Sequence, residues 1–420
     1  MKFPVRTLAE AKLVLDRERP ELDPARPEDK RLYVDRDAAV HDRLITKAMA
    51  AAASQRDFRW FFTGHTGTGK STELNRIVRN DQLASRYIPH IYRVRDSLDV
   101  HNLDFTDIIL GIAQSVADVA TDREVAVPKR LQERMQKWGR ETELETQLGL
   151  SPEGKGGIEF NLLIGKASLE VQAGGEKRKI VREKLSESLT DFVKLTDDLV
   201  AAVERKIKKK VLVVIDTLDH VDHRPIRDIF TNHWASLSQP KVSLLIVIPL
   251  PLLLEPQFMG SVQDSFSLLP NIKVFGNQDS RDLDPAGFAF FREVIAHLAD
   301  PALFTEDALR EVFRISGGMV RDMIGHAGDA CKYADHDNPR GKVELRHVQR
   351  VLDDRKAFFR RLLARADYEI LKEVSAHPSL LGNEGLGSLL HLKAVIYYPN
   401  GEGWYGLHPA VAAILESAKR

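Results

Sequence analysis

The sequence predicts an α/β protein with a doubly wound parallel sheet, followed by a helical lid and a small winged-helix domain. Strand-like segments that are mostly apolar, such as 211–215, 241–248 and the expected fifth strand 271–276, alternate with helix-compatible segments, as in sheets covered on both faces. A glycine-rich segment follows the first strand and precedes a helix, at the edge where such sheets bind ligands. After residue 280 helical patterns follow one another, and a strand–turn–strand pattern leads to a closing helix.

The glycine-rich segment lies within FFTGHTGTGKSTELNR, residues 61–76. Its three glycines permit backbone angles closed to other residues, so successive N–H groups can surround an anion. The pattern G-x-x-x-x-G-K-[ST] is complete; Lys70 adds a mobile positive charge and Ser71 a hydroxyl where magnesium would sit. We therefore predict that ATP or ADP phosphates bind at Gly64, His65, Thr66, Gly67, Thr68, Gly69, Lys70, Ser71 and Thr72.

The acidic partner of this loop is expected at the end of the buried strand 211–215. Asp216 directly follows the apolar run, and a phosphate loop needs a carboxylate to hold magnesium, usually through water. We predict that Ser71 and Asp216 hold Mg²⁺, although Asp216 could also cap the next turn. Asp219 either orients the attacking water or caps the helix that begins near Pro225.

The composition of the 420-residue chain is that of a soluble globular protein, with 43% hydrophobic and 29% charged residues. Lys plus Arg equals Asp plus Glu, at 61 each, so no global field favours nucleic acid or acidic lipid. The single cysteine, Cys331, excludes an intramolecular disulfide and suits a reducing compartment. Without a secretory leader or a membrane-length apolar run, we expect a cytoplasmic protein with no membrane partner.

Changes of pattern along the chain predict four parts. Residues 1–32 are charged and proline-bearing, which indicates an arm, and 33–280 form the α/β core. Within that core, 121–180 form an insert, in which a charged helix precedes two alternating runs that predict a β-hairpin. Residues 281–352 are expected to form a helical lid and 353–420 the winged helix.

At this point the chain resembles the AAA+ and STAND P-loop ATPases, which combine such a loop, an acidic strand end, a helical lid and often a winged helix. AAA+ members usually place a catalytic glutamate directly after the strand's aspartate, whereas Thr217 stands here. The sequence DTLD, which ends in Asp219, is similar to the acidic motif of NACHT-type STAND proteins. The resemblance implies an oligomeric Mg-dependent ATPase. The arginine finger and polar first sensor of AAA+ proteins have no counterpart from 241 to 280, which implies slow turnover.

Two further residues gain roles from the resemblance alone. The segment ISGGMVRDMIGHAG occupies the lid-motif position of both families, which implies that Arg321 contacts the bound phosphates; it could instead face solvent. His408 stands where NB-ARC proteins carry a winged-helix histidine that touches the ADP phosphate. Pro409 departs from that motif, and His408 could equally be a helix-start histidine without a ligand.

Other chemistries receive less support. Residues 353–420 carry nine basic and eight acidic residues, and the segment at the recognition-helix position is nearly uncharged, so protein contacts are favoured over DNA. His220, His223 and His233 lie near Asp216, but their spacing matches no common zinc signature.

The sequence thus predicts an ATP-binding, slowly hydrolysing switch whose nucleotide state controls self-association or effector binding. By analogy with the family, a role in bacterial defence or signalling follows. The alternative is a DNA-binding AAA+ ATPase that acts as a loader or remodeller. A third hypothesis is a scaffold that holds nucleotide without cleaving it.

Overall fold

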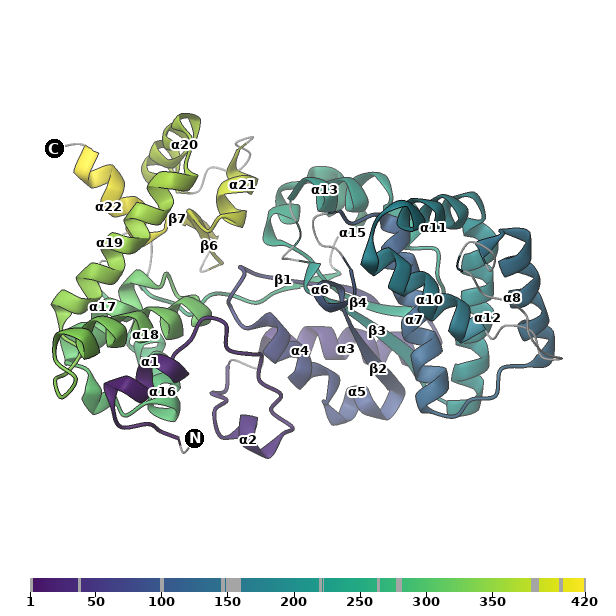
Figure 1. The fold of residues 1–420 in the computed structure, drawn as a ribbon, viewed down its shortest axis with the longest axis horizontal. Coiled ribbons are helices and arrows are strands. Elements are labelled where there is room, and N and C mark those ends of the chain that lie inside the picture. Colours follow the sequence, from purple (N-terminus) through teal and green to yellow (C-terminus); the bar gives the residue numbers. More distant parts are fainter. Residues whose placement is uncertain are drawn as a thin grey trace. The chain divides into compact units, whose positions relative to one another are not determined.

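The computed structural model describes most of the chain (Figure 1), namely residues 3–36, 39–98, 102–144, 148, 160–218, 221, 223–262, 265–276, 282–378, 385–399 and 403–418. The chain divides into two compact units. Unit 1 comprises Met1–Ala38, Thr63–Arg76 and Leu268–Arg420. Unit 2 comprises Ala39–Phe62 and Ile77–Ser267.

Unit 2 is built on a five-stranded sheet with the strand order β2-β3-β4-β1-β5, which confirms the predicted parallel α/β core. Its strands are β1 (Arg59–Thr63), β2 (Tyr87–Arg93), β3 (Lys210–Asp216), β4 (Ser243–Val247) and β5 (Phe266–Leu268). The pairs β2–β3, β3–β4 and β4–β1 are parallel. The core of β3, from Val211 onward, and all of β4 are buried, because helices cover both faces of a doubly wound sheet.

Most helices of unit 2 contribute apolar side chains to one buried core around the sheet. The central one is α7 (Phe105–Asp122), which starts at a capping box formed by Asp104 and Asp107. The others are α3 (Ala39–Ala53), α5 (Asp81–Arg86), α6 (Val94–Ser97), α8 (Lys129–Glu141), α10 (Phe160–Ala173), α11 (Glu176–Glu187), α12 (Leu189–Ile207), α13 (His223–Asn232), α14 (Trp234–Leu237) and α15 (Pro256–Val262).

The β-hairpin predicted within 121–180 is wrong where the structure describes it, because residues 160–173 form the helix α10. Its buried residues Leu163, Ile164, Ala167 and Val171 recur at helical spacing, and they belong to the core cluster that includes α7. Short apolar runs do not distinguish the two periods, and here helical packing decides. The predicted strand at 271–276 is also absent: Phe275 makes only an isolated bridge with Leu283, and the fifth strand is β5.

Unit 1 contains a helical lid and a winged helix, but the boundary predicted between residues 352 and 353 falls inside one continuous helix, α19 (Leu345–Leu362). The lid helices are α16 (Pro285–Leu298), α17 (Glu306–Ile315), α18 (Val320–Asp337) and α19. The winged helix comprises α20 (Arg365–Ala376), α21 (Leu386–His391), the antiparallel strands β6 (Val395–Tyr398) and β7 (Trp404–Leu407), and α22 (Pro409–Ala418). Unit 1 also contains α1 (Leu8–Val14), α2 (Pro27–Lys30) and the start of α4 (Lys70–Val78).

The N-terminal segment packs against the lid rather than forming a free arm. Helix α1 lies beside α18 in Figure 1, where glycines remove the side chains that would separate the two. A Cβ on Gly328 would lie 1.8 Å from the Leu15 carbonyl oxygen, and one on Gly325 would lie 2.0 Å from Arg17 Cγ. The salt bridge Arg17–Asp329, 2.9 Å long, adds to this contact. The segment is therefore part of the folded unit 1.

Replacing Gly328 by alanine should displace the N-terminal segment, because the new methyl group meets backbone rather than a movable side chain. We expect a loss of about 1–3 kcal/mol of stability, as for other overpacked sites. Thermal melting and the rate of proteolysis within residues 3–36 measure the effect. Gly260→Ala in α15 is the matched control, since its Cβ would meet nothing within 4 Å. Equal melting and cleavage of the two variants would contradict this packing.

Candidate functional site

The predicted phosphate loop connects β1 to α4 in the strand–loop–helix arrangement that its motif requires. Gly64, Gly67 and Gly69 have φ angles of +152°, +94° and +99°, which side chains rarely adopt. Space is equally restrictive at Gly64, where a Cβ would lie 2.6 Å from the Leu269 carbonyl oxygen. These glycines are therefore needed for the path of the loop.

The carbonyl oxygen of His65 organises the interior of the loop. It accepts hydrogen bonds from Lys70 Nζ at 2.9 Å, from Thr68 Oγ1 at 2.9 Å and from Thr68 N at 3.2 Å. Lys70 Nζ also donates to the Gly64 carbonyl oxygen at 2.9 Å. Lys70 is buried, with 4% of its surface exposed, so its charge is concentrated inside the loop.

Residues before the first strand hold the loop and α4, a contribution that the sequence did not indicate. Arg36 donates from its two terminal nitrogens to the carbonyl oxygens of Thr68 and Pro270, both at 2.5 Å. Burial lowers the pKa of this guanidinium. The hydroxyl of Thr72, predicted to bind cofactor, accepts a hydrogen bond from Leu22 N at 3.2 Å. Arg36 lies in a charged stretch without a motif, so only the folded structure identifies it.

The lid contacts the phosphate loop at the start of α18, shortly after the glycine pair Gly317–Gly318. Arg321 N donates to the Gly67 carbonyl oxygen at 2.9 Å, and a Cβ on Gly67 would lie 3.0 Å from Arg321 Cβ. Gly318 lies in the turn before α18, and its carbonyl oxygen accepts a hydrogen bond from Ile272 N at 2.9 Å. The structure therefore places the backbone of Arg321 against the phosphate loop, at the start of α18.

The winged helix contacts the same loop through the side chain of His65. Tyr397 N in β6 donates to His65 Nε2 at 2.8 Å. Burial, together with the charges of Lys70 and Lys393, lowers the pKa of His65 to about 3. The ring is therefore neutral at pH 7, and its Nε2 acts as the acceptor.

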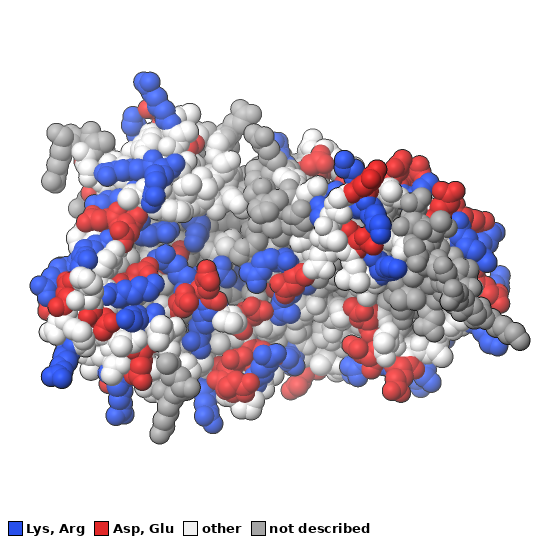
Figure 2. Space-filling view, viewed as in Figure 1, with Lys and Arg blue, Asp and Glu red and all other residues white. Residues whose placement is uncertain are grey.

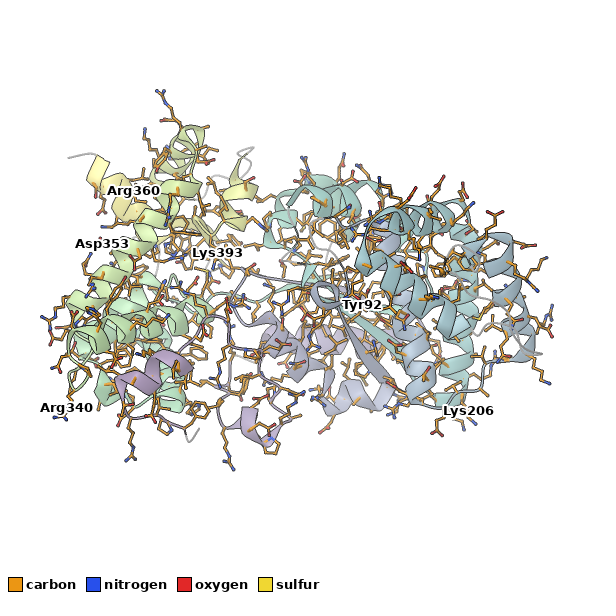
Figure 3. The ribbon with its side chains drawn as sticks, viewed as in Figure 1. Tyr92, Lys206, Arg340, Asp353, Arg360 and Lys393 are labelled. Carbon is orange, nitrogen blue, oxygen red and sulfur yellow. The ribbon has the colours of Figure 1, made fainter. Side chains whose placement is uncertain are left out.

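A partly buried ion pair joins the lid to the winged helix. Lys393, labelled in Figure 3, has a left-handed φ of +60° and places Nζ 2.9 Å from Asp322 Oδ2. The charge of Lys393 contributes to lowering the pKa of the fully buried Asp322 despite its desolvation. His326, on the next turn of α18, is fully buried and near this pair.

His408 lies in the interior of unit 1, with 1% of its surface exposed. Its Nδ1 accepts a hydrogen bond from Ala410 N at 3.1 Å, and its ring packs against Phe359 at a centroid distance of 4.8 Å. Burial lowers its pKa to about 3. These contacts are those of a histidine at the start of a helix, and its predicted contact with ADP stays a prediction.

In unit 2, Asp216 is the last residue of β3 and is 2% exposed. Its Oδ1 accepts a hydrogen bond from Thr217 N at 2.7 Å, within the turn where Thr217 has a φ of +70°. Ile215 and Phe61 both pair with Ile246 of β4, so β3 and β1 end at the same edge of the sheet.

Asp219 and His220 lie outside the described residues, as does the side chain of His223. His233 stacks on Phe105 with a centroid distance of 4.3 Å. No cluster of three metal-ligating side chains occurs in the described part of the chain. Likewise, none of the described helices is long and apolar enough to cross a membrane.

The fold is similar to that of several solved structures. Cdc6p from Pyrobaculum aerophilum is 13% identical, with a TM-score of 0.37, over 93% of this chain and 99% of that one. Orc1 from Aeropyrum pernix, solved in complex with DNA, is 14% identical, with a TM-score of 0.43 and coverages of 97% and 96%. The RuvB Holliday junction branch migration motor from Thermotoga maritima is 11% identical, with a TM-score of 0.36 and coverages of 96% and 98%.

At identities this low, the similarity concerns the fold alone. No protein-family model and no curated protein matches the chain.

Unit 1 should lose stability as the pH falls from 6.5 toward 3. His65 and His408 have folded pKa values of about 3, below the unfolded value of about 6.5, so the unfolded state binds more protons across this range. Each histidine contributes up to about 1.4 kcal/mol per pH unit. Asp322, Arg355, Lys393 and Arg17 face His408 and set its environment.

Melting temperatures between pH 4.5 and 7.5 measure this loss. His408→Asn keeps an acceptor for Ala410 N without titrating here, so its melting temperature should fall less steeply with pH than that of the wild type. The exposed His336 supplies the control, and His336→Asn should reproduce the wild-type slope. Identical slopes for all three proteins would show that His408 is not held neutral.

Proposed function

We propose that the chain binds Mg-ATP at the phosphate loop, hydrolyses it slowly, and uses its nucleotide state to control self-association or effector binding. The observation that supports this most directly is the hydrogen bond from Arg321 N to the Gly67 carbonyl oxygen, 2.9 Å long. Through it the lid rests on the loop that would hold the phosphates. A change in the loop on binding or loss of a γ-phosphate would then act on the lid first.

The loop residues fit this task. The N–H groups between Gly64 and Lys70, together with the start of α4, form an anion-binding turn, and Lys70 supplies the positive charge. In this proposal, Ser71 at the first turn of α4 and the buried Asp216 at the end of β3 hold Mg²⁺. The ion would neutralise charge that develops on the phosphates.

The remaining predicted residues have narrower roles within the proposal. The side chain of Arg321 contacts the phosphates from its position at the start of α18, and Asp219 orients the attacking water. Thr217 stands where AAA+ proteins carry a catalytic glutamate, so turnover is slow. Slow turnover suits a switch, because the bound state then persists long enough for a partner to respond.

Lys70→Ala should abolish Mg-ATP binding, because the loop loses the ammonium group that donates to the carbonyl oxygens of Gly64 and His65. Isothermal titration calorimetry with Mg-ATP measures the affinity, and melting curves confirm that the variant is folded. Lys342→Ala, at an exposed lysine of the same unit, is the control and should bind as the wild type does. Tight ATP binding by the Lys70 variant would refute the site.

A second candidate function is that of a DNA-binding ATPase, and the charge of α19 favours it. This helix carries six Lys or Arg and two Asp residues, a net charge of +4. Figure 2 shows Lys and Arg side chains over the part of unit 1 where α19 lies, and Arg360 and Asp353 are labelled on it in Figure 3. Such a basic helix beside a winged helix could contact phosphates, since phosphate neutralisation supplies most DNA affinity.

If α19 binds DNA, replacing Arg360 and Arg361 together by alanine should weaken duplex binding several-fold and reduce the salt slope by about 2. Fluorescence anisotropy with a labelled duplex at several salt concentrations measures both quantities. The control pair is Lys129→Ala with Arg130→Ala, two exposed basic residues at the start of α8. Wild-type protein that shows no salt-dependent duplex binding would leave the switch as the better hypothesis.

A further inference from the structure

We propose that the winged helix positions the phosphate loop through His65, so that nucleotide affinity depends on the docking of β6 against the loop. The inference rests on the proposed nucleotide site and adds a positioning residue to it. The contact that carries it is the hydrogen bond from Tyr397 N to His65 Nε2, 2.8 Å long, between residues 332 positions apart.

His65 is suited to this role because its two ends are fixed by different parts of unit 1. Its ring is held by β6, while its carbonyl oxygen accepts from Lys70 Nζ and from both donors of Thr68. His65 is 3% exposed, so neither end can be satisfied readily by water. Moving the ring therefore disturbs the carbonyl oxygen around which the loop is built.

The strand that holds His65 is itself fixed to the lid. Ile396 and Tyr398, the neighbours of Tyr397, pack on Met319, and the Tyr398 hydroxyl donates to the Gly317 carbonyl oxygen at 3.3 Å. A Cβ on Gly317 would lie 2.4 Å from Ile396 Cδ1, so only glycine permits this approach.

Lys393 lies two residues before β6, and its ion pair with Asp322 is a second link between the winged helix and the lid. Arg321, next to Asp322, bonds the Gly67 carbonyl oxygen. The winged helix thus reaches the phosphate loop by two routes: directly at His65, and through the lid at Gly67.

This arrangement has a consequence for binding. When β6 is docked, His65 is held and the loop is pre-organised for phosphate; when β6 leaves, Tyr397 N–H and His65 Nε2 both lose their partner. The apparent affinity then equals the affinity of the docked state multiplied by the fraction of molecules in which β6 is docked. By linkage, bound nucleotide must stabilise the docked winged helix by the same factor.

The test compares His65→Leu, which removes the acceptor, with His65→Gln, whose side-chain oxygen can accept from Tyr397 N. Binding of a fluorescent mant-ATP with Mg²⁺ is measured by titration, and melting curves verify folding. We expect His65→Leu to bind roughly five- to tenfold more weakly, the effect of one lost hydrogen bond, and His65→Gln to bind within about twofold of the wild type.

Hydrogen–deuterium exchange of peptides that cover β6 supplies the readout that a purely local role would not change. Saturating Mg-ATP should slow exchange in β6 of the wild type and of His65→Gln, but not of His65→Leu. The inference would be overturned if His65→Leu bound mant-ATP as tightly as the wild type. It would also be overturned if this variant bound more weakly but Mg-ATP still slowed exchange in β6 as much as in the wild type. If the wild-type protein binds no mant-ATP, the proposed function fails and takes this inference with it.

Discussion

The backbone of the phosphate loop imposes the constraint on which the rest of unit 1 depends. Gly64, Gly67 and Gly69 all have left-handed φ angles, and neighbouring atoms occupy the space that side chains would fill at the first two. The Leu269 carbonyl oxygen closes over Gly64, and Arg321 Cβ lies against Gly67. The loop also brings the charge of Lys70 into its interior, where Nζ donates to the carbonyl oxygens of Gly64 and His65.

Elements from distant parts of the sequence meet at this loop. Arg36 comes from the N-terminal segment, Arg321 from the lid and Tyr397 from the winged helix, and each bonds a loop residue. The Lys393–Asp322 pair contributes little net stability, since the cost of desolvating the buried Asp322 carboxylate offsets much of the attraction. We interpret this ion pair as a contact that fixes the orientation in which the winged helix docks on the lid. The equal numbers of basic and acidic residues in the whole chain give no indication of these local contacts.

The sequence predicted the features that short local patterns encode. The phosphate loop, the buried strand that ends in Asp216, the lid helices and the β6–β7 hairpin each follow from a motif or an uninterrupted periodicity. The β-hairpin predicted in the insert was wrong because FNLLIGKASLEV fits both the strand period and the helix period. Packing against α7 selects the helix. The contact between β6 and His65 could not be predicted, since its donor is a backbone N–H that leaves no trace in residue identity. Arg36 was missed because nothing local distinguishes it from neighbouring charges.

The central claim is that the loop amides grip a triphosphate whose metal is held by Ser71 and Asp216. A crystal structure of the full chain with Mg²⁺ and a non-hydrolysable ATP analogue tests it most directly. The account predicts β- and γ-phosphates within hydrogen-bond distance of the amides between Gly64 and Lys70, with the metal bound to the Ser71 hydroxyl and facing the Asp216 carboxylate. At saturating analogue, a loop without phosphate, or an analogue bound elsewhere, would contradict it.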